Sequence, residues 1–249
     1  HRQLPGETLC NGSSSNVAHQ ASDSGSAETI AKMCNLSLSE GYFPDCLKNA
    51  IVRPRLKKTN LDLEDMNSYR PISNLTFLSK TVERVVAIRF VEHSELHKLM
   101  PCHQSAYRSF HSTETAVLAV HNDIVRTIDS GKISALVLLD LSAAFDTIDH
   151  SILLARLHSM YGVDGSALMW LESYLSLRVQ YVKFGQDVSP TTQLKTGVPQ
   201  GSVLGPILFT SFISPIQFVA ANFKVDQQQY ADDIQLWPSG IGSHLGRNR

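Results

Sequence analysis

Three aspartates stand at positions where a carboxylate is costly unless it has a partner. Asp140 ends the apolar run ISALVLLD, and Asp232 and Asp233 are adjacent between two segments with a strand-like pattern. A carboxylate at the end of a buried strand needs a counterion, and neighbouring carboxylates in a tight turn repel each other unless a cation lies between them. Carboxylate oxygens are the ligands that Mg²⁺ prefers. The pattern therefore predicts a magnesium site, although each aspartate taken alone is also typical of a solvated turn.

Seven short strings occur in order along the chain and include these aspartates. They are YRPIS (69–73), QSAYR (104–108), STE (112–114), LDLSAAFD (139–146), RVQYV (178–182), GVPQGSVLGP (197–206) and YADD (230–233). One short string such as Y-x-D-D is weak evidence by itself, whereas seven in register are specific. Over residues 29–238 the chain resembles the reverse transcriptase domain of non-LTR retrotransposons, the long interspersed elements.

The resemblance implies an α+β fold of the right-hand polymerase type, with fingers and a palm whose antiparallel sheet is backed by helices. We expect a flexible or degraded leader at 1–27, a fingers-like region at 28–132, the palm with its catalytic motifs at 133–238 and an unmatched tail at 239–249. The thumb of this family and its downstream lysine find no match. We therefore expect a partial domain with the thumb missing.

The resemblance also implies the metal site and its ligands. Asp140, Asp232 and Asp233 match the family's catalytic carboxylates, and the backbone carbonyl of Leu141 would be a further ligand. The expected cofactor is a pair of Mg²⁺ ions, with Mn²⁺ as a substitute. Two such ions about 3.5–4 Å apart can hold both the attacking and the leaving oxygen of a phosphoryl transfer.

Four further residues match nucleotide-binding positions of the family. Phe145 matches the aromatic gate that excludes a 2′-hydroxyl, with core packing as the alternative. Gln200 matches the residue beside the incoming nucleotide, and Gly201 would allow the backbone a close approach. Arg70 matches a cation of the fingers. Scaffold roles alone are expected for three neighbours that follow the pattern: Asp146, Asp149 and His150.

The charge balance hides a basic strip. With 22 Lys+Arg and 23 Asp+Glu the formal net charge is −1, which by itself argues against a nucleic-acid partner. Five cations nevertheless fall between residues 48 and 58 with no acid among them: Lys48, Arg53, Arg55, Lys57 and Lys58. We expect this strip to contact nucleic-acid phosphates, and a plain solvated strand edge is the alternative.

The implied function is RNA-directed DNA polymerisation, a nucleotidyl transfer in which deoxynucleotides are added to a primer 3′-hydroxyl. The implied partners are an RNA template, a DNA primer and deoxynucleoside triphosphates. The alternative is a truncated, inactive nucleic-acid-binding or vestigial fragment. No apolar stretch approaches the roughly 18 residues that a membrane span needs. We expect an intracellular protein, in the nucleus by family resemblance, and the oligomeric state is not predicted.

Periodicity and turn residues predict the elements that must position these groups. Helices are predicted over 28–39, 75–99, 113–128 (capped by Ser112), 150–160, 166–175 and 201–219. Strands are predicted over 50–56, 133–140, 178–184, 191–196, 224–230 and 234–237, with a turn-rich segment at 60–73. Pro54 predicts an edge strand, and the apolar run before Asp140 predicts a fully buried one.

Overall fold

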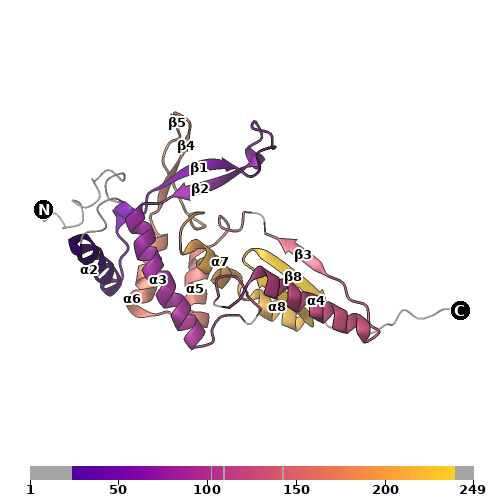
Figure 1. Cartoon of the computed structure of the whole chain (residues 1–249). Helices are drawn as coiled ribbons and strands as arrows, with labels where there is room; N and C mark the ends of the chain where they lie inside the picture. The colour runs from indigo at the N-terminus through magenta and orange to yellow at the C-terminus, as the bar shows by residue number, and fades with distance from the viewer. Residues whose placement is uncertain (1–23, 102, 109, 142, 239–249) are drawn as a thin grey trace. The chain divides into compact units, whose positions relative to one another are not determined.

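A computed structural model describes residues 24–238 of the 249-residue chain, apart from residues 102, 109 and 142 (Figure 1). The described residues form two compact units. The first unit contains the residues up to Glu92 together with 145–205, and the second contains 93–144 and the residues from 206 onward. This division differs from the predicted boundary at 132. The first helix of the described part of the chain begins at Ser24, inside the predicted leader, and the predicted tail lies outside the described residues.

The first unit contains a mixed sheet in the order β2-β1-β4-β5, with β6 also paired to β4. Its strands are β1 (Ala50–Leu56), β2 (Tyr69–Asn74), β4 (Val179–Phe184), β5 (Asp187–Val188) and β6 (Thr192–Gln193). β1 pairs antiparallel with β2 and parallel with β4, so the prediction that β1 is an edge strand is wrong. β1 pairs with β4 only as far as Val52, so Pro54 does not need to donate a hydrogen bond to β4.

The predicted turn-rich segment contains a strand that sequence alone did not indicate. Residues 69–74 form β2, and its register with β1 places Pro71 opposite Pro54. Two facing prolines carry a weak strand signal, because proline donates no hydrogen bond to the ladder. Pairing with β1, which ends at Leu56, decides the conformation here.

The helices of the first unit are α2 (Ser24–Glu40), most of α3 (Phe77–Leu96), α5 (His150–Tyr161) and α6 (Gly165–Leu175), so the predicted helices there are confirmed. α6 packs on both α2 and α5. The rings of Phe43 and Trp170 meet edge to face at 5.3 Å between centroids, and the Trp170 indole donates to the Ser37 hydroxyl at 2.9 Å. Such buried aromatic pairs contribute about 0.5–1.5 kcal/mol beyond the area they bury.

The second unit contains the antiparallel sheet β3-β8-β7 with helices against one strand of it. Its elements are α4 (Thr113–Asp129), β3 (Val137–Asp140), nearly all of α7 (Gly205–Ile213), α8 (Ile216–Asn222), β7 (Val225–Tyr230) and β8 (Asp233–Pro238). The predicted cap of α4 is confirmed, since the Ser112 hydroxyl accepts from the Thr115 N–H at 3.2 Å. The single helix predicted over 201–219 is wrong, because Pro215 lacks an N–H group and separates α7 from α8.

The strand that ends at Asp140 is shorter and more exposed than predicted. β3 begins only at Val137, and Leu138 keeps 68% of its surface exposed, so the prediction of a fully buried strand is wrong. Both α4 and α8 pack on β7, and β3 is at the end of the three-stranded order.

The helices of the described residues were also compared with the length and apolar character of a membrane span, and none of them meets both requirements.

Candidate active site

The register of the second unit brings Asp140 and Asp233 face to face. β3 pairs with β8 so that these two residues are directly opposite, and β7 pairs with β8 so that Tyr230 is also opposite Asp233. Opposite residues of antiparallel strands point to the same face, with Cβ atoms about 4.5–5.5 Å apart. Ala231, at φ 56°, and Asp232 form the turn between β7 and β8. The third aspartate is therefore the immediate neighbour of this pair along the chain.

The charge of these carboxylates is not balanced by a side-chain cation within the described part of the chain. Ion pairs such as Lys32–Glu28 and Lys48–Asp45 lie in the first unit and do not include these aspartates. Like charges directly opposite each other destabilise a sheet, and a divalent cation with oxygen ligands would remove that cost. By residue type and register the aspartates thus fit a divalent metal. No cluster of three acidic, histidine or cysteine side chains close enough to hold one is formed among the described residues, so the fit rests on the Asp140–Asp233 pair.

A second part of the predicted site is built in the first unit, where two sequence strings are joined by their backbones. The N–H of Gly197 donates to the carbonyl of Ile148 at 2.8 Å, and the N–H of Val198 donates to the carbonyl of Phe145 at 2.9 Å. The His150 ring Nε2 donates to the carbonyl of Gly197 at 2.7 Å. The segment of Phe145, the predicted gate residue, is therefore hydrogen-bonded to Gly197 and Val198, which begin the string that contains Gln200.

Gly201 lies where the loop approaches β2. Its φ is +116°, and a Cβ atom there would lie 2.8 Å from the carbonyl oxygen of Ser73. The N–H of Ser73 donates to the carbonyl of Gln200 at 2.7 Å, so loop and strand hold each other. Arg70 lies on the same strand, three residues before Ser73. The first unit thus carries Arg70, Gln200 and Gly201 on a shared backbone scaffold.

The family that matches the chain is described as "Reverse transcriptase (RNA-dependent DNA polymerase)", and the match covers residues 56–246. The chain belongs to this reverse transcriptase family. The match extends past residue 238, where the resemblance of the strings ends.

Curated relatives of this reverse transcriptase chain are polymerases of non-LTR retrotransposons. "Probable RNA-directed DNA polymerase from transposon BS" of Drosophila melanogaster is 32% identical over 83% of this chain and 23% of its own length. The corresponding polymerase of the X-element from the same organism is 31% identical over 94% of this chain and 25% of its own. The chain therefore spans about a quarter of the length of these relatives. The recognition from the sequence strings is confirmed.

A solved structure of apo telomerase from Candida tropicalis shares the fold. It aligns with a TM-score of 0.54 over 87% of this chain and 44% of the telomerase chain, at 12% sequence identity. At such low identity the likeness concerns the fold alone. It confirms the predicted α+β, right-hand polymerase architecture for this reverse transcriptase domain.

Two arginines of the predicted basic strip and the separately predicted Arg70 lie on one face of the β1–β2 hairpin. Arg53 and Arg55 are alternate residues of β1, and Arg55 is directly opposite Arg70 of β2. All three side chains are exposed, as are Lys57 and Lys58 just after β1. Two arginines facing each other repel, which costs stability unless an anion lies against them. We refer to Arg53, Arg55 and Arg70 as the arginine face.

Lys48 differs from the other members of the strip, because its side chain is buried and already paired. Its ammonium group lies 2.8 Å from the Asp45 carboxylate and 5.7 Å from the centre of the Tyr42 ring, with only 3% of the side chain exposed. The hydrogen bond from Lys48 lowers the pKa of Asp45. A count of charges along the sequence does not show such partners. Lys48 therefore supports the local fold, and we leave it out of the nucleic-acid surface.

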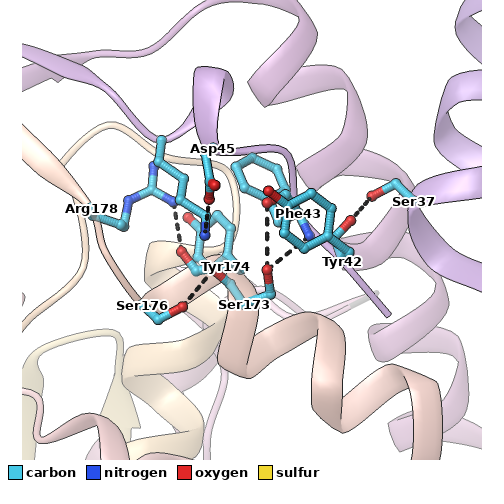
Figure 2. A network of polar contacts seen from close by, with 9 residues as sticks. Ser37, Tyr42, Phe43, Asp45, Ser173, Tyr174, Ser176 and Arg178 are labelled. Atoms are coloured by element: carbon cyan, nitrogen blue, oxygen red, sulfur yellow. Dashed lines mark hydrogen bonds and ion pairs between the residues drawn. The ribbon is translucent and has the colours of Figure 1, made fainter. Parts of the chain in front are cut away.

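Arg178 of the RVQYV string is also buried, in the network shown in Figure 2. Its guanidinium donates to the carbonyl of Tyr174 at 2.9 Å and lies 4.5 Å from the centre of the Tyr174 ring and 5.8 Å from that of Phe43. Cations over aromatic faces are stabilised by about 0.5–2 kcal/mol. This string thus has a packing role that its letters alone did not reveal.

A buried polar ladder supports the hairpin of the YADD string, and the QSAYR string contributes half of it. The N–H of Gln229 donates to the carbonyl of His103 at 2.8 Å, and the N–H of Ser105 donates to the carbonyl of Gln229 at 3.0 Å. The Gln228 amide donates to the Ser105 hydroxyl at 2.7 Å. The run of three glutamines before Tyr230 is the sequence signal that could have indicated this pairing.

The environment of Tyr107, from the same QSAYR string, includes the charge of Asp232. Burial, and after it the negative charge of Asp232, raises the pKa of the Tyr107 hydroxyl. Tyr107 also has a left-handed backbone, at φ 58°. Such backbone conformations persist in non-glycine residues only when surrounding contacts hold them. The negative charge of Asp232 therefore reaches the hydroxyl of Tyr107.

Proposed function

We propose that this chain carries the polymerase activity of its family, copying an RNA template by adding deoxynucleotides to a DNA primer. The observation that supports this most is the register that places Asp140 opposite Asp233 at the end of the hairpin that carries Asp232. The proposed metal ligands are these three carboxylates and the carbonyl of Leu141. The alternative of a vestigial fragment is not favoured, because the Asp140–Asp233 pair is formed and the hairpin beside it is supported by the buried hydrogen bonds of Gln229.

The proposed chemistry is mostly positioning and charge neutralisation. Two bound Mg²⁺ ions, or Mn²⁺ in their place, would supply positive charge at the attacking and leaving oxygens. The carboxylates of Asp140, Asp232 and Asp233 hold that charge at the end of the sheet. Gln200 and Gly201 line the place of the incoming nucleotide, Phe145 excludes a 2′-hydroxyl, and the arginine face binds phosphates. Action in the nucleus remains a prediction from the family.

Primer extension tests the proposed activity. The 249-residue chain, and the same chain fused to the C-terminal continuation of one of its relatives, is incubated with poly(rA)/oligo(dT) and dTTP. We expect extension that requires Mg²⁺ or Mn²⁺ and stops with EDTA. The proposal is wrong if neither protein extends the primer although both are folded by circular dichroism.

Removing two members of the arginine face is expected to weaken nucleic-acid binding. In Arg55→Ala/Arg70→Ala, up to two phosphate contacts are lost, so the slope of log affinity against log salt should fall by about 1 per contact. The melting midpoint should not fall, because the change removes the repulsion between opposite arginines. Fluorescence anisotropy of a labelled template–primer at several salt concentrations measures both affinity and slope.

The matched control for this prediction is Arg89→Ala, an exposed arginine of α3 away from the hairpin. We expect it to leave the salt slope unchanged. If the control and the double variant lose the same slope, the arginine face has no special part in binding.

The gate prediction for Phe145 has a direct readout in the choice of sugar. With Phe145→Ala the space under the sugar enlarges, so ribonucleotides should be incorporated relative to deoxynucleotides roughly 10²-fold more often. Single-nucleotide incorporation with rUTP and dTTP on poly(rA)/oligo(dT) gives the ratio of kcat/KM. If the ratio is unchanged in an active variant, Phe145 is a packing residue instead.

A further inference from the structure

Glu83, in the middle of α3, is a fully buried acid with 0% of its surface exposed. Its Oε2 accepts hydrogen bonds from the N–H of Val203 at 2.7 Å and the N–H of Leu204 at 3.2 Å. Its Oε1 accepts from the hydroxyl of Ser79 at 3.0 Å. A buried carboxylate is stable only when such donors replace its water. Two of the three donors belong to the backbone of the GVPQGSVLGP string.

The segment from Gln200 to Leu204 is thereby held at both of its ends. At one end the carbonyl of Gln200 accepts from the N–H of Ser73 in β2 at 2.7 Å. At the other end Glu83 binds the N–H groups of Val203 and Leu204. Only two residues separate Gln200 from Val203, so the two anchors act on one short piece of backbone.

The charge of Glu83 also acts on a buried tyrosine of α6, Tyr174. Burial first, and then the negative charge of Glu83, raises the pKa of Tyr174, whereas the positive charge of Arg178 acts in the opposite direction. Arg178 is itself 1% exposed and stacks on the Tyr174 ring, as Figure 2 shows. A buried anion and a buried cation therefore act on the same tyrosine.

We infer that Glu83 is a positioning residue for the incoming nucleotide: by holding the backbone at Val203 and Leu204, it fixes the place of Gln200. The inference rests on the proposed function, since it assumes that Gln200 lies beside the nucleotide. Glu83 acts through the loop and does not contact substrate. A side chain placed about 1 Å away from its productive position can cost roughly 10²-fold in rate.

The variant Glu83→Gln keeps the size of the side chain but removes its charge and turns one acceptor into a donor. We expect the KM for dTTP to rise roughly 10- to 100-fold, with a smaller change in kcat and none in template–primer affinity. The matched control is Glu92→Gln, an exposed acid on the same helix, which should leave all three unchanged. Assays are run below the melting midpoint of every variant.

A double-variant cycle separates positioning from a general loss of stability. If Glu83 acts through Gln200, then Glu83→Gln/Gln200→Ala should have the same KM as Gln200→Ala alone. Amide hydrogen exchange gives a second readout that needs no activity. We expect faster exchange at Val203 and Leu204 in Glu83→Gln, and unchanged exchange in α5.

The outcomes distinguish this inference from the proposed function. The role of Glu83 is overturned if the two substitutions raise the KM for dTTP independently, so that their fold-changes multiply in the double variant. It is also overturned if amide exchange at Val203 and Leu204 is unchanged. In both cases an active wild type leaves the proposed function in place. A wild-type chain that extends no primer overturns the proposed function, and the role of Glu83 in the reaction is lost with it. The inference is supported if the double variant has the KM of Gln200→Ala alone and amide exchange at Val203 and Leu204 is faster in Glu83→Gln.

Discussion

Asp140→Asn is expected to reduce metal-dependent primer extension by about 10³-fold or more, because several kcal/mol of charge stabilisation depend on the metal ligands. The substitution changes charge but hardly changes shape. Asp140 is exposed at the end of β3, directly opposite Asp233, so no packing contact is lost. We therefore expect normal folding together with a nearly inactive enzyme, measured by primer extension across a range of Mg²⁺ concentrations.

The same variant has a second readout that does not depend on activity. In the wild type, bound Mg²⁺ should raise the melting midpoint, because a ligand that binds only the folded state stabilises it. Asp140→Asn should abolish this increase. Without metal, the variant should melt no lower than the wild type, because the repulsion between Asp140 and Asp233 is gone.

The control for Asp140→Asn is Asp226→Asn, in the β7–β8 hairpin at the end away from Asp233, where Asp226 is opposite Trp237. This exposed aspartate has the same chemistry but lies outside the proposed ligand set. We expect it to retain extension and the Mg²⁺-induced increase in melting midpoint. An Asp140→Asn protein with near wild-type extension would show that the register does not mark the metal site.

Local signals were enough to predict most elements and the strands that carry the carboxylates. The cap at Ser112 and the apolar spacing of α3, α5 and α6 act within a few residues, so they can be predicted from sequence. The burial of β3 could not, because it depends on which strand α4 and α8 cover. The place of β1 within its sheet likewise depends on β4, more than a hundred residues later.

The predicted site residues also follow from local sequence, whereas their partners in the fold do not. The aspartates and Gln200 follow from short strings, whereas the buried partners that hold them are distant in sequence. Glu83 and Val203 are 120 positions apart, and nothing in the neighbourhood of Glu83 distinguishes it from a surface acid of an amphipathic helix. Lys48 shows the converse, because a cation that counts toward a basic strip is used in the fold.

Gly197→Ala is expected to lower the stability of the first unit by about 2–3 kcal/mol. Gly197 has φ +80°, and a Cβ atom there would lie 2.6 Å from the carbonyl oxygen of Phe145 and 2.8 Å from the Cα of Asp146. Both neighbours are backbone atoms, which cannot move aside as a flexible side chain would. Relief of the clash must therefore disturb the hydrogen bonds from Gly197 and Val198 that join the two strings.

The melting midpoint of Gly197→Ala should fall by roughly 5–10 °C, and primer extension should fall with it, because Phe145 and Gln200 flank the disturbed contact. The matched control is Gly185→Ala, in a turn with φ +58° and no atom within 4 Å of the added Cβ. There only the left-handed backbone opposes the methyl group, at about 1–2 kcal/mol. The difference between the two variants measures the steric part alone. Equal melting midpoints would mean that the two strings are not packed as closely as the hydrogen bonds of Gly197 require.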